Sequence, residues 1–212
     1  MTDPRPVAVL YVDVRRGPYA SMPGVECWGE ERDARLYPGP HSVVAHPPCQ
    51  RWGAFWRGGL RAGKPRKGGG ICPVYQLGDD GGCFAAALAA VRRWGGVLEH
   101  PAHSRAWAHF GLPSPPPEGW ALDILGGASC QVEQGHYGHP CPKPTWLYAV
   151  GVDLPSLRWG PSGAAGRILR DRARGKVGTM IIRKTARHLT PPAFADLLVG
   201  MARSAKEQGR DV

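Results

Sequence analysis

The chain has 212 residues, of which 42% are hydrophobic, and this length suits one domain with a full core better than two. Its formal net charge of +10 favours a polyanionic partner such as nucleic acid, although a basic surface without that role stays open. No apolar run approaches the ~20 residues of a membrane-spanning helix, which argues against a membrane protein.

The cysteines and the first residues indicate the compartment. Six cysteines show no disulfide-framework spacing, and the polar residues 1–6 do not resemble a signal peptide. We therefore expect free thiols in a reducing cytoplasm.

The first two predicted elements are strands. Residues 7–14 form a continuous apolar run, typical of a strand buried in a parallel sheet, and residues 25–28 predict a second strand. In a nucleotide-binding fold the first turn would carry several glycines, but only Gly17 is present. Glu30 is placed to bind a ribose hydroxyl, or is a solvated charge on a short connection.

A third predicted strand, residues 42–46, ends abruptly at Pro47 and Pro48. Cys49 is thereby held stiffly at the carboxyl end of a strand, where open α/β sheets bind ligands. Such a thiol is a candidate nucleophile when nearby charge favours the thiolate, and Arg51 could supply that charge. The alternative is a buried cysteine after a proline-rich turn.

Residues 57–70 form a basic, glycine-rich segment without apolar periodicity, and we expect it to be mobile. Its cations could contact phosphates as the segment closes over a nucleic acid strand. A surface loop with incidental charge is the alternative. The cations are Arg57, Arg61, Lys64, Arg66 and Lys67.

A helix and a fourth strand follow this segment. Residues 83–94 predict an alanine-rich helix behind an aspartate N-cap at residues 79–80, and residues 97–101 predict a strand stopped by proline. Glu99 therefore occupies the same topological position as Cys49. We expect both side chains at one edge of the sheet.

The remaining predicted elements are two helices and a pair of strands that could run antiparallel. They are a helix over residues 104–110, strands over residues 129–134 and 146–150, and a helix over residues 192–205 capped by Thr190.

Zinc binding is an alternative use of the histidines. His100-x-x-His103 and His136-x-x-His139-x-Cys141 offer nitrogen and sulfur ligands at short spacings. Neither is a standard paired-cysteine pattern, and the same histidines suit a polar rim or phosphate contacts. We therefore assign no metal.

Four motifs follow one another along the chain. They are Pro47-Pro48-Cys49-Gln50, Glu99 at a strand end, Tyr137-Gly138 followed by Pro140, and Arg187-His188-Leu189-Thr190-Pro191. In this order they resemble the cytosine-5 DNA methyltransferases, most of all short phage-type relatives. The resemblance implies an α/β, Rossmann-like methyltransferase fold with a mostly parallel sheet, in a single domain over residues 1–212. For a phage protein, the compartment would be the host cytoplasm.

The resemblance also implies catalytic roles. Cys49 would add to carbon 6 of a flipped-out or unpaired cytosine, and Glu99 would bind the Watson–Crick edge of the base. Lys143 or Arg51 would hold the carbonyl oxygen of the base. This role requires a desolvated Glu99 whose pKa is high enough to keep its proton available near neutral pH.

The implied cofactor is S-adenosylmethionine, with contacts at Asp13, Gly17, Glu30 and Pro47. The family's first glycine loop is absent, however, and its recognition domain is reduced to residues 157–187, too few for a separate core. Three alternatives therefore stay open: a nucleic-acid-binding protein of the same fold, a different donor, and a free pyrimidine nucleotide as substrate.

Overall fold

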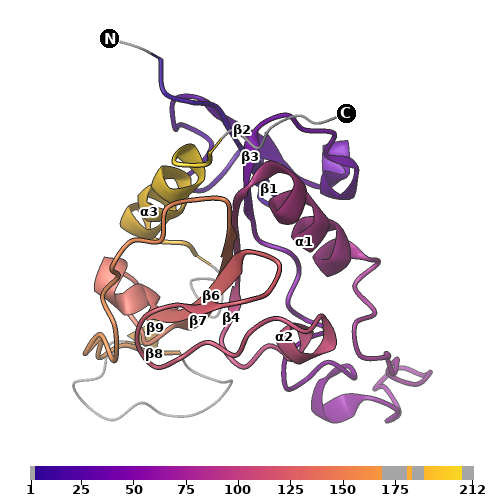
Figure 1. Ribbon diagram of the computed structural model, residues 1–212. Coiled ribbons are helices and arrows are strands. Elements are labelled where there is room, and N and C mark those ends of the chain that lie inside the picture. The colour runs from indigo at the N-terminus through magenta and orange to yellow at the C-terminus, as the bar shows by residue number, and fades with distance from the viewer. Residues whose placement is uncertain (1–2, 169–180, 183–188, 207–212) are drawn as a thin grey trace.

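The computed structural model describes residues 3–168, 181–182 and 189–206 (Figure 1). Its centre is a seven-stranded sheet in the order β2-β1-β3-β4-β7-β6-β5. The strands are β1 (Val7–Leu10), β2 (Val25–Trp28), β3 (Ser42–Ala45), β4 (Gly96–Pro101), β5 (Ala121–Leu122), β6 (Gly127–Glu133) and β7 (Pro144–Val150). β1 to β4 pair in parallel and the other pairings are antiparallel. The predicted α/β class is confirmed, but the predicted mostly parallel sheet is not: the sheet is mixed, with three parallel pairings among β1 to β4 and three antiparallel pairings beyond them.

Two helices cover the opposite faces of this sheet (Figure 1). α1 (Cys83–Trp94) and α3 (Pro192–Arg203) both contact β3 and β4, one from each side. The shorter elements are α2 (Arg105–His109), the 3-10 turns η1 (Glu30–Arg32), η2 (Ala34–Leu36), η3 (Gly59–Arg61) and η4 (Gln134–Tyr137), and the parallel pair β8 (Arg167–Ile168) and β9 (Ile181–Ile182).

The parallel strands are apolar throughout because they serve two cores. Successive side chains of a strand point to opposite faces of the sheet. Val43 and Ala45 therefore join Phe84 in the core under α1, while Val44 joins Phe194 in the core under α3. Burial on both faces explains why these strands lack a polar alternation.

Asp80 holds the start of α1. Its carboxylate accepts hydrogen bonds from the backbone N–H groups of Gly82 (3.0 Å) and Phe84 (2.9 Å). It also accepts one from the indole N–H of Trp52 (2.8 Å), a side chain that is 2% exposed. The capping residue itself is Gly82, two positions beyond the predicted aspartates. Asp80 nevertheless accepts hydrogen bonds from backbone N–H groups at the N-terminus of α1, and through Trp52 it joins the helix to the loop that carries Cys49.

We expect Asp80→Ala to lower the free energy of unfolding by about 2 kcal/mol, because the change removes a helix cap and leaves a buried indole N–H without its acceptor. Urea unfolding followed by tryptophan fluorescence measures the loss. The neighbouring Asp79 is exposed, so Asp79→Ala is a matched control with an expected change below about 0.5 kcal/mol. Equal losses in the two variants would contradict this role of Asp80.

The strand predicted over residues 7–14 ends four residues early, at Leu10. Tyr11 has a φ of 64°, in the left-handed region, and this conformation turns the chain out of the sheet. Asp13 and Gly17 consequently lie in an exposed loop beyond the strand.

The other elements agree with prediction to within a few residues. α1 has the predicted bounds, α2 begins behind the N-cap Ser104, and β6 and β7 pair antiparallel. The helix predicted over residues 192–205 ends at Arg203, and its N-cap is Pro191 rather than Thr190. β5 was not predicted, because two residues carry too little pattern to mark a strand.

The segment over residues 157–187 is described only in part. Leu157 is buried and Trp159 is partly buried against the core under α3. Residues 169–180 and 183–187 lie outside the described residues, so the prediction of a reduced recognition region is untested there. Among the described residues, no helix is both long enough and apolar enough to cross a membrane.

Candidate functional site

The cysteine loop follows β3, and Glu99 lies within the neighbouring parallel strand β4. Ala45 of β3 pairs with Leu98 of β4. The next residue of each strand, His46 and Glu99, therefore lie side by side at the carboxyl ends, and their side chains are joined by a hydrogen bond. Cys49 comes three residues after His46.

The loop that carries Cys49 is a tight turn. The carbonyl oxygen of Cys49 accepts hydrogen bonds from the backbone N–H groups of Trp52 (3.1 Å) and Gly53 (3.2 Å). The Trp52 ring packs against Phe84 of α1, with ring centroids 5.7 Å apart. Cys49 itself is half-buried, so packing of its neighbours fixes the turn while the thiol residue keeps partial exposure.

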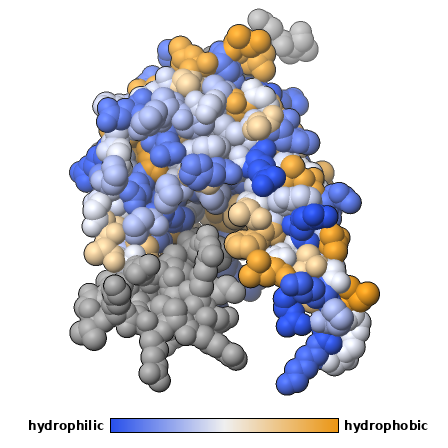
Figure 2. Space-filling model, turned by 90° about the horizontal axis from the view of Figure 1, so that it is seen from below, coloured by the Kyte–Doolittle hydropathy of each residue, from blue (hydrophilic) through white to orange (hydrophobic). Residues whose placement is uncertain are grey.

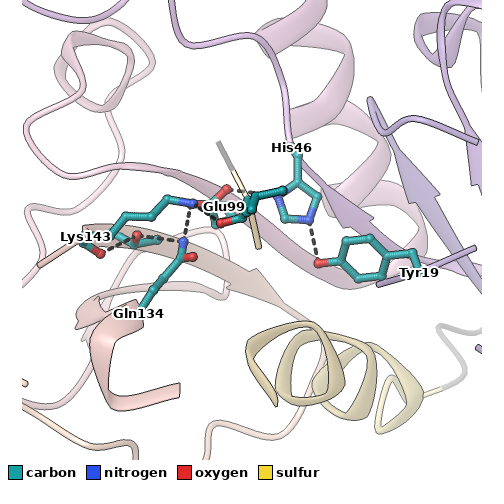
Figure 3. A network of polar contacts seen from close by, with 7 residues as sticks. Tyr19, His46, Glu99, Gln134 and Lys143 are labelled. Atoms are coloured by element: carbon teal, nitrogen blue, oxygen red, sulfur yellow. Dashed lines mark hydrogen bonds and ion pairs between the residues drawn. The ribbon is translucent and has the colours of Figure 1, made fainter. Parts of the chain in front are cut away.

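Glu99 is the centre of a polar network drawn in Figure 3. Its Oε2 lies 2.9 Å from Nδ1 of His46, and Nε2 of that ring lies 2.8 Å from the hydroxyl of Tyr19. Its Oε1 accepts a hydrogen bond from the Gln134 amide (3.1 Å), which also donates to the Thr145 hydroxyl (3.0 Å). The network therefore joins five parts of the fold, which are the loop after β1, the residue directly after β3, strand β4, the turn η4 and strand β7.

The partners of His46 indicate where its proton lies. The Glu99 carboxylate can only accept, so Nδ1 of His46 carries a proton and donates to it, while Nε2 lies within hydrogen-bond distance of the Tyr19 hydroxyl. Burial raises the pKa of Tyr19 well above its ordinary value, so this hydroxyl keeps its proton and can donate. His46 is thus held from both sides in one orientation.

Glu99 is ionised at neutral pH. Burial alone would raise the pKa of this side chain, but the hydrogen bond and the charge interaction with His46, followed by the charge of Lys143, outweigh burial and lower the pKa below its ordinary value. Figure 3 shows the Lys143 side chain directed towards Glu99; its Nζ also donates to the carbonyl oxygen of Leu189 (3.0 Å). The expectation of a proton-bearing Glu99 is wrong, because a cation and two donors surround it.

The two cations expected to hold a base oxygen lie in different surroundings. Lys143 lies beside Glu99, as its effect on the carboxylate pKa requires. The Arg51 guanidinium instead lies 3.3 Å over the ring of Tyr75, and its Nη1 is 3.4 Å from the carbonyl oxygen of Trp56. Arg51 therefore fastens the segment after Cys49, and its described contacts do not reach Glu99.

The histidines considered as zinc ligands are dispersed among other contacts. His100 is 1% exposed between the rings of Phe84 and Trp107, and burial lowers its pKa to about 4. His139 hydrogen-bonds through Nδ1 to the backbone of Cys141. Within residues 3–168, 181–182 and 189–206, no group of three histidine, cysteine or acidic side chains could hold a metal.

The residues expected to bind S-adenosylmethionine lie in the loops that follow β1, β2 and β3. Asp13, Gly17 and Glu30 are exposed, whereas Pro47 is buried. Asp13 already accepts a hydrogen bond from the backbone N–H of Arg15 (2.9 Å), and no atom lies within 4 Å of where a Cβ of Gly17 would be. The loop after β1 thus forms no glycine cradle, and the binding of a ribose by the exposed Glu30 stays a prediction.

Two hollows of the described surface lie away from Cys49 and Glu99. One is between β6 and the loop at residues 160–161, and the other is between α1 and η2. Neither is lined by Cys49 or Glu99.

The basic segment after Cys49 forms a projecting hairpin. Backbone hydrogen bonds join Gly63 to Cys72 (3.0 Å), Cys72 to Lys64 (2.9 Å) and Arg66 to Gly70 (2.9 Å). All five predicted phosphate ligands of this segment are exposed: Arg57, Arg61, Lys64, Arg66 and Lys67. The expected mobility of the segment stays a prediction.

Comparison of this chain with family models, with curated proteins and with solved structures finds no match. The resemblance to the cytosine-5 methyltransferases therefore stays a prediction from four motifs. Of the last motif, residues 187–191, the first two residues lie outside the described residues.

Sequence reasoning missed four members of the Glu99 network, which are Tyr19, His46, Gln134 and Thr145. Tyr19, Gln134 and Thr145 belong to no motif. His46 offered a signal, because a histidine that directly precedes Pro47 must lie at the end of the same strand as the cysteine loop. Its pairing with Glu99 follows once β3 and β4 are taken as neighbours.

Proposed function

We propose that this chain modifies a pyrimidine base of DNA, a cytosine at carbon 5, through a covalent adduct between Cys49 and carbon 6. The observation that carries this proposal is the register of β3 and β4, which brings the cysteine loop and the buried carboxylate of Glu99 to one sheet edge. The strand order, with antiparallel β7 between β4 and β6, supports a Rossmann-like methyltransferase fold for the chain.

The proposed chemistry conserves charge and protons. The Cys49 thiolate forms a bond to carbon 6, and the displaced electron pair makes carbon 5 nucleophilic. Carbon 5 then bonds to an electrophilic carbon of the donor as the bond between that carbon and its leaving group breaks. A water molecule takes the proton of carbon 5, the electron pair of that C–H bond re-forms the double bond between carbons 5 and 6, and the thiolate leaves carbon 6. The ionised Glu99 accepts a hydrogen bond from the exocyclic amino group of the base, and Lys143 donates to its carbonyl oxygen.

The donor is a separate part of the proposal. S-adenosylmethionine is the methyl donor that the resemblance implies, and Glu30 is the residue best suited to its ribose. Because the loop after β1 lacks a glycine cradle, we assign no further step to this cofactor. A different donor, or a free nucleotide as substrate, would use the same thiol.

The second candidate is a nucleic-acid-binding protein of the same fold without catalysis. The observation that favours it is the number of internal partners at Glu99, whose two oxygens contact His46 and Gln134. Binding a base would require at least one of these contacts to be exchanged.

A DNA oligonucleotide that contains 5-fluorocytosine tests the proposal. Fluorine cannot leave carbon 5 as a proton does, so the adduct formed with S-adenosylmethionine present is trapped and moves slowly on a denaturing gel. We expect an adduct with the native chain and with Cys72→Ala, which removes another half-buried thiol, and none with Cys49→Ala.

The same reaction without S-adenosylmethionine tests the donor: an adduct that forms only when S-adenosylmethionine is present assigns this compound as the donor. Salt-sensitive DNA binding without any adduct would reject a DNA-modifying enzyme that uses S-adenosylmethionine and would support the binding protein.

A further inference from the structure

The segment after the cysteine loop concentrates positive charge. We call residues 55–78 the basic lobe. No aspartate or glutamate occurs anywhere between residues 34 and 78, so nothing within the lobe neutralises its cations. The lobe projects from the end of the molecule at which β4 ends (Figure 1). Its partner must therefore be anionic and must approach the same end as a ligand of Cys49 and Glu99.

The basic lobe is joined directly to the cysteine loop. The Arg51 guanidinium stacks on Tyr75 at 3.3 Å, and the backbone N–H of Gly78 donates to the carbonyl oxygen of Arg51 (3.1 Å). Arg51 lies two residues after Cys49. A polymer held on the lobe is thereby brought to the loop that carries the thiol.

The basic lobe also exposes apolar side chains to water. The exposed fractions are 80% for Leu60, 68% for Ile71, 54% for Val74 and 49% for Phe55. Figure 2 shows hydrophobic and hydrophilic residues side by side over the projecting lobe. Apolar side chains gathered on one projection mark a binding surface rather than scattered exposure.

The combination of charge and apolar surface favours an unpaired strand over a duplex. A duplex presents phosphates and polar groove edges, and its base faces are stacked within the helix. An unpaired strand presents phosphates together with free base faces, which aromatic and apolar side chains cover while cations follow the backbone.

We infer that the basic lobe binds unpaired DNA, with its cations on the phosphates and with Phe55, Leu60 and Ile71 against the base faces. The inference rests on the proposed function only in taking DNA as the polymer. It also explains how a base could reach Cys49 without the free-energy cost of leaving a duplex.

The test compares one sequence in two forms. The full chain with Cys49→Ala is titrated with a fluorescent single-stranded oligonucleotide of about 16 nucleotides and with its duplex. We expect the single strand to bind about tenfold more tightly. Phe55→Ala and Leu60→Ser are expected to weaken single-strand binding about tenfold each, with duplex binding nearly unchanged.

Two control variants separate apolar contact from charge. Ile124 is 100% exposed on the turn between β5 and β6, away from the basic lobe, so Ile124→Ser is expected to bind both forms like its parent. Arg66→Ala is expected to weaken the binding of both the single strand and the duplex. It is also expected to reduce the slope of log affinity against log salt concentration by about one.

Equal binding of the duplex, or single-strand binding unchanged by Phe55→Ala and Leu60→Ser, would overturn the inference. Tighter binding to vesicles of phosphatidylserine and phosphatidylcholine than to the single strand would overturn it as well. Because these measurements use a chain without the thiol, they are independent of whether the native chain forms the 5-fluorocytosine adduct.

Discussion

Replacing His46 with alanine is expected to lower the free energy of unfolding by about 3 kcal/mol. The side chains of His46 and Glu99 are 12% and 11% exposed and meet at 2.9 Å. The substitution leaves an ionised carboxylate in a buried site without its main donor, and it removes the hydrogen-bond partner of the Tyr19 hydroxyl. Urea unfolding at pH 7 measures the change.

A double-mutant cycle attributes this loss to the buried charge. In a Glu99→Gln background there is no carboxylate to leave uncompensated, so His46→Ala is expected to cost only about 1–2 kcal/mol. Tyr19→Phe, which removes a single hydroxyl, is expected to cost about 1 kcal/mol. If His46→Ala costs the same in both backgrounds, the histidine fills space and does not stabilise the charge of Glu99.

Acidification from pH 6.5 towards pH 4 is expected to remove about 3 kcal/mol of stability through His100 alone. The pKa of this histidine falls from 6.5 in the unfolded chain to about 4 in the fold, mainly because the ring is buried. Between pH 6.5 and about 4, the unfolded chain therefore binds a proton at His100 that the folded chain does not bind. The contribution is fully present above pH 6.5 and is lost as the pH falls to about 4.

Unfolding curves recorded at several pH values isolate the contribution of His100. His100→Phe keeps an aromatic ring beside Phe84 and Trp107 and cannot titrate, so its stability is expected to change little between pH 6.5 and 5. His109→Gln removes a histidine that is exposed at the end of α2, and it is expected to retain the acid loss of the native chain. A persistent acid loss in His100→Phe would assign the effect to other groups.

Local patterns in the sequence were sufficient for some elements and insufficient for others. α1 was predicted with its bounds because alanine, leucine and phenylalanine repeat at helical spacing between a capping aspartate and a glycine pair. The end of β1 was missed because it depends on the left-handed conformation of Tyr11, which a run of apolar residues does not reveal. β5 has too few residues to carry any pattern.

The charge state of Glu99 could not be predicted from its own surroundings in the sequence. Neighbouring residues indicate only that the side chain is buried, which by itself predicts a raised pKa. The groups that lower the pKa include Lys143, which precedes β7, while Gln134 in η4 donates to the carboxylate. Both become neighbours only because β7 lies between β4 and β6, a pairing that residues far apart in the chain determine.

The position of β7 has a consequence for how the site opens. β4 and β7 are paired along both of their edges, so their amide hydrogens exchange with solvent only when a larger part of the sheet comes apart. Cys49 lies instead in the turn before Trp52, whose ring packs against Phe84 and whose indole N–H donates to Asp80, so this turn is fastened to the start of α1. Deuterium uptake is therefore expected to be slow around Glu99, so that an incoming ring meets a stationary carboxylate, whereas uptake around Cys49 follows the opening of the contacts at the start of α1.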